Sequence, residues 1–269
     1  MENQEISKSR NQQITGMLTR YRVNDGTLII DLGARRPVLS SAPCGGGLVH
    51  VRYILNHQVQ ANPLAASLTK SGKVWGDPSR SLGKLAARLG ADARCVGLMT
   101  AVPMKQLVTL REQKDHLWVE GFITVGVSNA VRAGESPPPT EAGPKTKPVG
   151  TINIILVTNA RLASSAMVGL VQVATEAKTA VILAKGVPSW TGRREATGTG
   201  TDVVAVASGA GPMLRYSGTH TEIGVLVGRL VLQGVAEGLR QSDRWQSLMT
   251  RRPATTKCGG RNGMGRKRC

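Results

Sequence analysis

The fold is decided by residues 151–207, in which three pieces stand out: TINIILVT (151–158), LASSAMVGLVQVATEAKTAVILAK (162–185) and DVVAVA (202–207). The first and third are short apolar runs rich in β-branched residues, typical of buried strands. The middle piece repeats apolar residues at helical spacing and stops at Gly186 and Pro188. One side of this predicted helix carries Met167, Leu170, Val171, Ala174, Ala177 and Val181.

Working outward, residues 221–239 have a second long helical pattern, so the second half of the chain reads β-α-β-α. The first half is richer in strands. It has strand-like runs at 27–32, at 96–101 and on both sides of Gly45, Gly46 and Gly47, a hairpin of 108–112 with 117–127, and a helix at 79–89 with a Ser N-cap and Gly90 as its stop. We therefore predict a single-domain α/β fold, leaning to α+β, with a mixed β-sheet flanked by helices.

Composition shifts set the boundaries of this domain. Residues 1–26 read as a polar N-terminal extension, 27–241 as the domain, and 242–269 as a basic tail. Five prolines within 136–149 indicate an internal loop. The tail combines basic residues with Gly and Thr, a composition that predicts disorder.

The net charge of +18 raises nucleic acid as a partner. Seven of these positive charges lie after residue 249, and the others are spread along the chain without a dense run. No aromatic residues alternate with basic ones, so we expect no specific nucleic-acid partner. A basic surface equally attracts an anionic metabolite.

Cysteine and histidine spacing argues against a metal centre. Cys44, Cys95, Cys258 and Cys269 form no CxxC pair, and the four histidines form no HExxH motif. We expect no metal and no cofactor. No run of about 18 apolar residues occurs, so we expect no membrane span and a cytoplasmic protein. A homo-oligomer is left open.

Four polar segments concentrate small residues without an evident folding reason: LSSAPCGGG (39–47), VGVSNAVRAGE (125–135), ATGTGTD (196–202) and YSGTHTEIG (216–224). Each lies at the end of a predicted element, where loops place functional groups. Caps and tight turns would explain each segment equally well. The Ser pair has no GxSxG elbow, and the glycines fit no nucleotide-binding pattern. Cys44 is either a thiol nucleophile or, more ordinarily, a small buried hydrophobe.

Two of these segments hold the residues most suited to proton transfer. His220 could shuttle a proton near neutral pH, with Asp202 orienting it. Ser217, Thr219 and the predicted helix start beside them offer hydroxyls and free N–H groups that could hold an oxyanion. The alternative is an ordinary N-cap and a turn aspartate.

The same segments resemble the adenosylcobinamide amidohydrolase family over residues 27–239. The resemblance rests on VLSSAPCGGGLVHVRYILNHQV (38–59), TVGVSNAVRAGE (124–135), TINIILVTNARL (151–162), ATEAKTA (174–180), ATGTGTDVVAVA (196–207) and YSGTHTEIGVLVGRLV (216–231), in this order. One departure stands out. In the family pattern an Asn precedes the last two glycines of the first motif, where this chain has Gly45.

The resemblance implies an enzyme that hydrolyses the amide joining aminopropanol to the corrin ring of adenosylcobinamide, yielding adenosylcobyric acid and 1-amino-2-propanol. This reaction belongs to corrinoid salvage and cobamide remodelling. Cobalt would enter only within the corrinoid substrate. A non-catalytic corrinoid-binding protein is the alternative.

Site residues follow from combining this chemistry with the four segments. The expected catalytic residues are His220, Asp202, Ser217 and Thr219. Substrate contacts are expected from Ser41, Gly46, Asn129, Arg132, Asn159, Glu176, Thr199 and Thr201. Lys178, beside Glu176, could complete a polar cluster unless both lie on a solvated helix face. Attack by an activated water is the preferred route, and a covalent Ser or Thr intermediate is the alternative.

Overall fold

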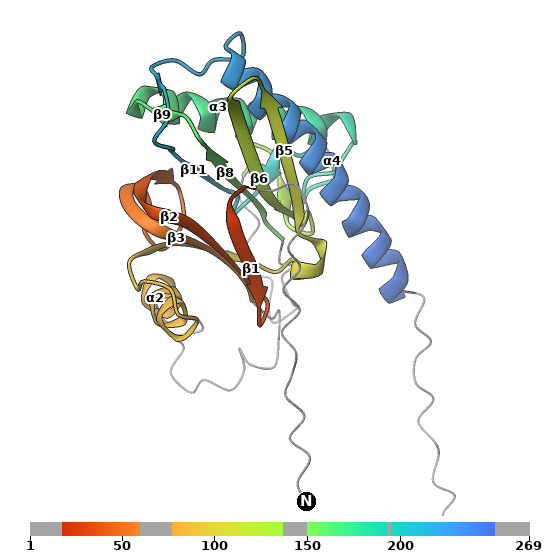
Figure 1. Ribbon diagram of the computed structural model, residues 1–269. Coiled ribbons are helices and arrows are strands. Elements are labelled where there is room, and N and C mark those ends of the chain that lie inside the picture. Colours follow the sequence, from red (N-terminus) through yellow and green to blue (C-terminus); the bar gives the residue numbers. More distant parts are fainter. Residues whose placement is uncertain (1–17, 60–76, 137–149, 193–194, 251–269) are drawn as a thin grey trace, which may run out of the picture.

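The computed structural model describes residues 18–59, 77–136, 150–192 and 195–250. Its main sheet is mixed and has eight strands in the order β4-β3-β2-β11-β8-β6-β5, with β1 paired to the outer part of β2 (Figure 1). The strands are β1 (Arg20–Asn24), β2 (Thr27–Ser40), β3 (Gly47–Gln58), β4 (Cys95–Thr100), β5 (Val108–Lys114), β6 (Leu117–Val125), β8 (Ile152–Thr158) and β11 (Val203–Ala207). The helices are α2 (Pro78–Arg88), α3 (Ser164–Ala184), α4 (Glu222–Thr250) and the 3-10 turn η1 (Met104–Gln106).

A sharp bend in β2 and β3 folds this sheet into two layers. The register between them shifts between Asp31 and Arg36, where Gly33 has a φ of +80°. Before the bend β2 pairs with β1, and after the bend it pairs with β11. Apolar residues of both halves then meet in one interior cluster: Leu28, Ile30, Ile54, Val96, Leu98, Phe122, Ile155, Val203 and Ala205 are among its members.

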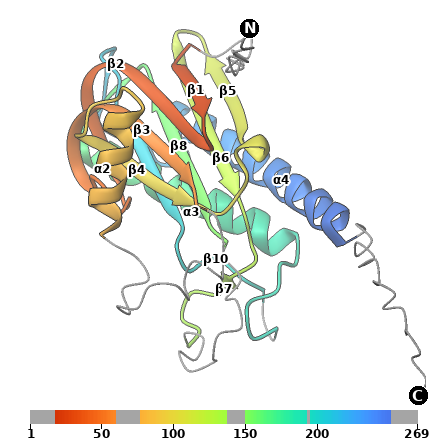
Figure 2. The ribbon, with the colours of Figure 1, turned by 90° about the horizontal axis from the view of Figure 1, so that it is seen from below.

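Strand alternation directs the neighbouring side chains outward to the helices. Ile29 and Leu55 lie next to Leu28 and Ile54 in sequence but pack with Leu82 of α2. On the other side, β6, β8 and β11 pack against α3 and α4 in the largest cluster. The molecule is thus layered as helix, sheet half, sheet half, helix pair, as Figures 1 and 2 show.

The helix pair lies close to the sheet because glycines remove side chains from the contact. A Cβ on Gly121 of β6 would lie 2.2 Å from Leu230 Cδ2 of α4. Helix α3 is long and apolar enough to cross a bilayer by length and composition, but half of it is buried inside the protein against β11 and α4. Its apolar character is therefore accounted for by core packing.

The predicted fold class is confirmed, and four details differ. Asp77, rather than a Ser, caps α2 by accepting from Ser79 N at 3.0 Å. Strand β1 lies inside the stretch 1–26 that was expected to be an extension, so that boundary is wrong for residues 20–24. Helix α4 continues to Thr250, into the expected tail. The two-residue ribbons β7 (Ala130–Val131) with β10 (Gly198–Thr199), and β9 (Arg161–Leu162) with β12 (Met213–Leu214), were not predicted. Most of the Pro-rich loop and of the basic tail, at 137–149 and 251–269, lies outside the described residues.

Candidate functional site

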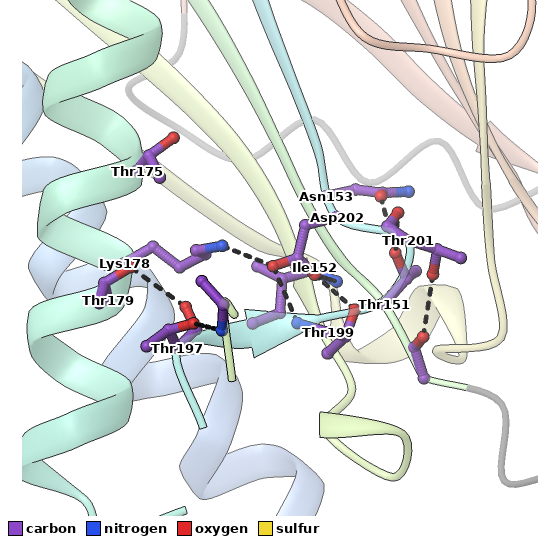
Figure 3. A network of polar contacts seen from close by, with 12 residues as sticks. Thr151, Ile152, Asn153, Thr175, Lys178, Thr179, Thr197, Thr199, Thr201 and Asp202 are labelled. Atoms are coloured by element: carbon purple, nitrogen blue, oxygen red, sulfur yellow. Dashed lines mark hydrogen bonds and ion pairs between the residues drawn. The ribbon is translucent and has the colours of Figure 1, made fainter. Parts of the chain in front are cut away.

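Asp202 stands immediately before β11, and both of its carboxylate oxygens are occupied. Oδ1 accepts from Ile152 N at 3.0 Å and from Thr199 Oγ1 at 2.5 Å. Oδ2 accepts from Thr199 N at 3.1 Å and from Lys178 Nζ at 2.5 Å (Figure 3). Four donors from three residues therefore fix the carboxylate in one orientation.

Lys178 is the charged partner in this cluster and lies on the inward face of α3. Its side chain is 9% exposed and that of Asp202 is 15% exposed. A charge this buried is tolerated because it is paired and hydrogen-bonded. An ammonium has three donors, and in the described part of the chain Asp202 occupies one of them. The other two N–H groups have no acceptor among the residues that the structure describes.

Gly198 makes room for the ion pair. A Cβ at this position would lie 2.5 Å from Asp202 Oδ2 and 2.7 Å from Lys178 Nζ. Gly200, two residues later, faces open space. The first glycine of the GTGTD stretch is thus required by the pair, whereas a side chain fits at the second.

The ribbon of β7 and β10 joins this cluster to α3. Thr197 accepts at its hydroxyl from Ala133 N at 2.9 Å, and its carbonyl accepts from Thr179 Oγ1 of α3 at 3.1 Å. The ribbon brings the 125–135 segment, with Asn129 and Arg132, to the end of the sheet where β8 and β11 begin. We call this the Asp202 end.

A second group of polar side chains crosses between the two sheet layers at the Asp202 end. Asn153 of β8 donates to Asn56 Oδ1 of β3 and to the Met99 carbonyl of β4, both at 2.9 Å. Asn56 donates in turn to Thr124 Oγ1 of β6 at 3.1 Å. Asn56, Thr124 and Asn153 are completely buried. Thr151 links this group to the loop before β11 by donating to the Thr201 carbonyl at 2.8 Å.

Six of the expected site residues lie at the Asp202 end besides Asp202 itself. Thr199 contacts Asp202 directly, and Thr201 donates to the Gly150 carbonyl at 3.2 Å. The Oδ1 atom of Asn129 is buried against Gly150 and has no hydrogen-bond donor in the described part of the chain. Arg132 directly follows β7 (Ala130–Val131) and donates from Nη1 to the Glu195 carbonyl at 2.9 Å. The remaining two, Ser41 and Gly46, belong to the loop between β2 and β3.

That loop is built for close backbone approach. Ser41 N donates to the Val204 carbonyl at 3.3 Å, and a Cβ on Gly46 would lie 2.6 Å from the Ala42 carbonyl. Gly45, where the family resemblance leads us to expect an Asn, has a φ of +67°. A Cβ there would lie 2.5 Å from the Cys95 carbonyl oxygen. An Asn at residue 45 would therefore require the loop to lie further from β4.

The expected pairing of His220 with Asp202 is wrong. His220 and Thr219 are exposed in the turn before α4, at the end of the sheet opposite the Asp202 end. Ser217 is buried there and donates to the Ala166 carbonyl in the first turn of α3 at 2.7 Å. Lys178 lies roughly 18 Å further along the same helix at 1.5 Å per residue. The whole of β11 separates the two segments, so Asp202 pairs with Lys178 instead.

Asn159 and Glu176 also lie outside the cluster. Both ends of the Asn159 amide are used by the turn between β5 and β6, since Oδ1 accepts from Trp118 N at 3.0 Å and Nδ2 donates to the His116 carbonyl at 2.6 Å. Glu176 is exposed on α3 and accepts from Gln172 at 3.0 Å. The solvated-face alternative therefore holds for Glu176 but not for Lys178.

Sequence reasoning did not single out Asn56, Thr124, Thr151 or Asn153. A signal was present, because Asn153 interrupts the apolar strand TINIILVT and Asn56 follows the apolar run YIL. A buried amide in a strand needs partners, and the two-layer packing supplies them. That packing could not be read from either strand alone.

Comparison with known proteins identifies the family. The model of the adenosylcobinamide amidohydrolase family matches residues 11–247. An adenosylcobinamide amidohydrolase of Methanosarcina mazei is 34% identical over 232 residues, covering 82% of this chain and 97% of the relative. An uncharacterized protein of Methanocaldococcus jannaschii is 31% identical over 247 residues, covering 86% of this chain and 91% of the relative. A solved Pyrococcus horikoshii OT3 structure aligns with a TM-score of 0.41 and 11% identity, over 87% of this chain and 82% of that one. The sequence matches show that the chain belongs to the adenosylcobinamide amidohydrolase family, whose members are amide-bond hydrolases.

Proposed function

We propose that the protein hydrolyses the amide between aminopropanol and the corrin ring of adenosylcobinamide, or of a related cobamide. The products would be adenosylcobyric acid and 1-amino-2-propanol, and the reaction would serve corrinoid salvage or remodelling. Family membership supports the substrate class. Among the structural observations, the one that carries the proposal is the buried Lys178–Asp202 pair with Thr199 bound to the same carboxylate.

Amide hydrolysis makes two demands that this cluster can meet. Negative charge develops on the carbonyl oxygen as the nucleophile adds, and it is stabilised best by donors that are already fixed in place. Lys178 has two N–H groups directed to no described acceptor, and Asp202 holds its ammonium in place. We assign Lys178 the role of contacting the carbonyl oxygen of the scissile amide. Asp202 is then a positioning residue.

Thr199 supplies the second polar contact. Its hydroxyl proton is donated to Asp202 Oδ1, so its oxygen lone pairs point away from the carboxylate. In the preferred route, Thr199 orients a water that adds to the amide carbon. The C–N bond then breaks, and the amine leaves with a proton that came from the water. In the covalent alternative, Thr199 Oγ1 itself adds to the amide carbon, the C–N bond breaks as the amine leaves with the Thr199 hydroxyl proton, and water later hydrolyses the resulting ester.

The two routes differ in whether a covalent intermediate forms on the protein. A covalent ester on Thr199 would be trapped by hydroxylamine as a corrinoid hydroxamate, whereas the water route produces none. A Thr199→Ser variant would keep either route, because it retains the hydroxyl. A Thr199→Val variant would abolish the covalent route and would leave a measurable residual rate in the water route.

The deciding experiment incubates the purified protein with adenosylcobinamide and follows 1-amino-2-propanol and adenosylcobyric acid by mass spectrometry. Two glycine variants test the site. Gly198→Ala places a methyl group against both members of the ion pair, and Gly200→Ala places one in open space. We expect the first to lose at least 100-fold in kcat/KM and the second to stay within a few-fold of the parent protein.

Other outcomes contradict distinct parts of the proposal. Binding of adenosylcobinamide without product by the folded parent protein would instead support a non-catalytic corrinoid-binding protein. Equal activity of the two glycine variants would keep the reaction and remove the Lys178–Asp202 pair from the site.

The cytoplasmic location is also part of the proposal, and two buried cysteines that remain free are consistent with a reducing compartment.

A further inference from the structure

Two free cysteines come together between the loop 41–46 and β4. Cys44 and Gly97 exchange two backbone hydrogen bonds, from Cys44 N at 3.3 Å and from Gly97 N at 2.9 Å. Cys95 precedes Gly97 by two positions, so its side chain emerges on the same face of β4. Both thiols belong to the small cluster formed with Leu55 and Leu82.

The loop lies unusually close to Cys95. The Sγ atom of Cys44 is 3.7 Å from the Cys95 carbonyl oxygen. This approach depends on the neighbouring glycine, because a Cβ on Gly45 would lie 2.5 Å from the same oxygen. The two cysteines are therefore diagonal neighbours on paired segments, with both side chains in the same small cluster, and a disulfide requires their Cβ atoms to come within about 4.5 Å of each other.

The pair can be reached from solvent although each side chain is buried. Cys44 and Cys95 both line a surface pocket of about 580 Å³. Arg35, His50 and Arg94 line the same pocket, and Asp92 pairs with Arg35 at 2.7 Å. The rim therefore has more positive than negative side chains and favours an anionic reagent.

The two thiols have different acidities. A hydrogen bond from the Cys95 thiol lowers the pKa of Cys44 below its usual range, and a contact with Ser79 acts in the same direction. The contact with Cys44, together with burial, raises the pKa of Cys95. One thiolate beside one protonated thiol is the arrangement in which the first can attack a disulfide and the second can resolve the product.

We propose that Cys44 and Cys95 form a reversible thiol–disulfide couple that a small anionic disulfide, such as oxidised glutathione, oxidises through this pocket. The Cys44 thiolate attacks one sulfur of oxidised glutathione and expels the first glutathione thiolate. Cys95 then attacks Cys44 Sγ and expels the second glutathione thiolate, which takes up the Cys95 proton. Overall, two protein thiols are oxidised to one disulfide and one oxidised glutathione is reduced to two glutathiones. This inference does not depend on the proposed reaction.

The test uses the full chain with Cys258→Ser and Cys269→Ser, which leaves Cys44 and Cys95 as its cysteines. The protein is equilibrated with oxidised and reduced glutathione at several ratios, alkylated after acid quenching and digested without reduction. We expect the intact mass to lose two hydrogens and a disulfide-linked peptide pair to contain Cys44 and Cys95. Reduced glutathione in excess should reverse both changes.

Single variants separate the attacking thiol from the resolving one. Cys95→Ser should stop at a mixed disulfide between Cys44 and glutathione, whereas Cys44→Ser should leave Cys95 unmodified over the same time. Circular dichroism establishes that each variant is folded. If the folded parent protein keeps two alkylatable thiols at the most oxidising ratio, the couple does not exist and both residues are packing side chains. Equal modification of the two single variants would overturn the assigned roles, and the parent protein alone decides the couple if a variant does not fold.

Discussion

Lys178, in the second half of α3, and Asp202, immediately before β11, form an ion pair of 2.5 Å whose side chains are 9% and 15% exposed. The pair joins the helix layer to the sheet at the end where polar groups of both sheet layers meet. A buried pair costs desolvation energy that Coulomb attraction only partly offsets. The pair is therefore weak evidence for a stabilising role.

Removing one member of this pair should be costly. We expect Lys178→Met to destabilise the protein by about 3 kcal/mol, because it leaves the Asp202 carboxylate buried without its cation. The kcat should also fall at least 100-fold at urea concentrations at which the variant is still folded. Urea denaturation and the product assay measure the two effects. Glu176→Gln is the matched control on the exposed face of the same helix, with an expected change under about 0.5 kcal/mol.

His220→Ala should leave the reaction nearly intact. The side chain is exposed at the end of the sheet opposite the Asp202 end, and β11 separates it from the cluster. We expect kcat/KM within about 3-fold of the parent protein and an unchanged pH profile. A loss of 100-fold in kcat at full stability would place the reaction at the opposite end of the sheet and contradict the proposed site.

The amide network between the sheet layers should contribute measurably to stability. Asn153→Leu removes the donor to Asn56 Oδ1 and to the Met99 carbonyl, both of which are then left buried without it. An unsatisfied buried acceptor costs about 1–3 kcal/mol, so we expect a loss in that range in urea. Gln172→Leu, on the exposed surface of α3, is the control and should change the unfolding free energy by less than about 0.5 kcal/mol.

The bend of the main sheet should be sensitive to acid. Arg52 of β3 holds Asp31 of β2 through two hydrogen bonds, Nε to Oδ1 at 2.8 Å and Nη2 to Oδ2 at 2.9 Å. The Arg52 hydrogen bonds lower the pKa of Asp31 in the folded protein. The contribution of Asp31 is therefore complete above the ordinary aspartate pKa of about 3.9 and is lost as the pH falls through the lower folded value.

Thermal unfolding between pH 7 and pH 3 of the parent protein and of Asp31→Asn tests this dependence. At neutral pH the parent protein should unfold at a higher temperature than Asp31→Asn, and this difference should narrow at the acidic end of the range. A difference that is constant with pH would show that the carboxylate acts through its shape rather than its charge. Asp25→Asn, in the turn between β1 and β2, is the control and should follow the parent protein at every pH.

The sequence by itself determined the kind and order of most elements. Strands 151–158 and 202–207 and the helices between and after them could be predicted because their apolar spacing matches one period. Local chemistry also placed several ends correctly: Gly90 and Gly186 follow their helices with φ of +73° and +60°, and Thr221 caps α4 by accepting from Gly224 N at 3.2 Å. The polar character of the Thr199 to Asp202 stretch was likewise visible without a structure.

Only the tertiary structure decided which polar segments meet. Asp202 and His220 flank the same strand closely in sequence, but β11 extends about 16 Å between them at 3.3 Å per residue. Lys178 and Glu176 share one helical stretch, yet the 3.6-residue period turns one to the core and the other to solvent. Asn56 and Asn153 lie far apart in the chain, and the bend in β2 and β3 brings their strands face to face. The spacing of apolar residues in the sequence indicates the local helix or strand period. Which strand ends lie together, and which residues of the two layers face each other, depends on contacts between segments that are distant in the chain.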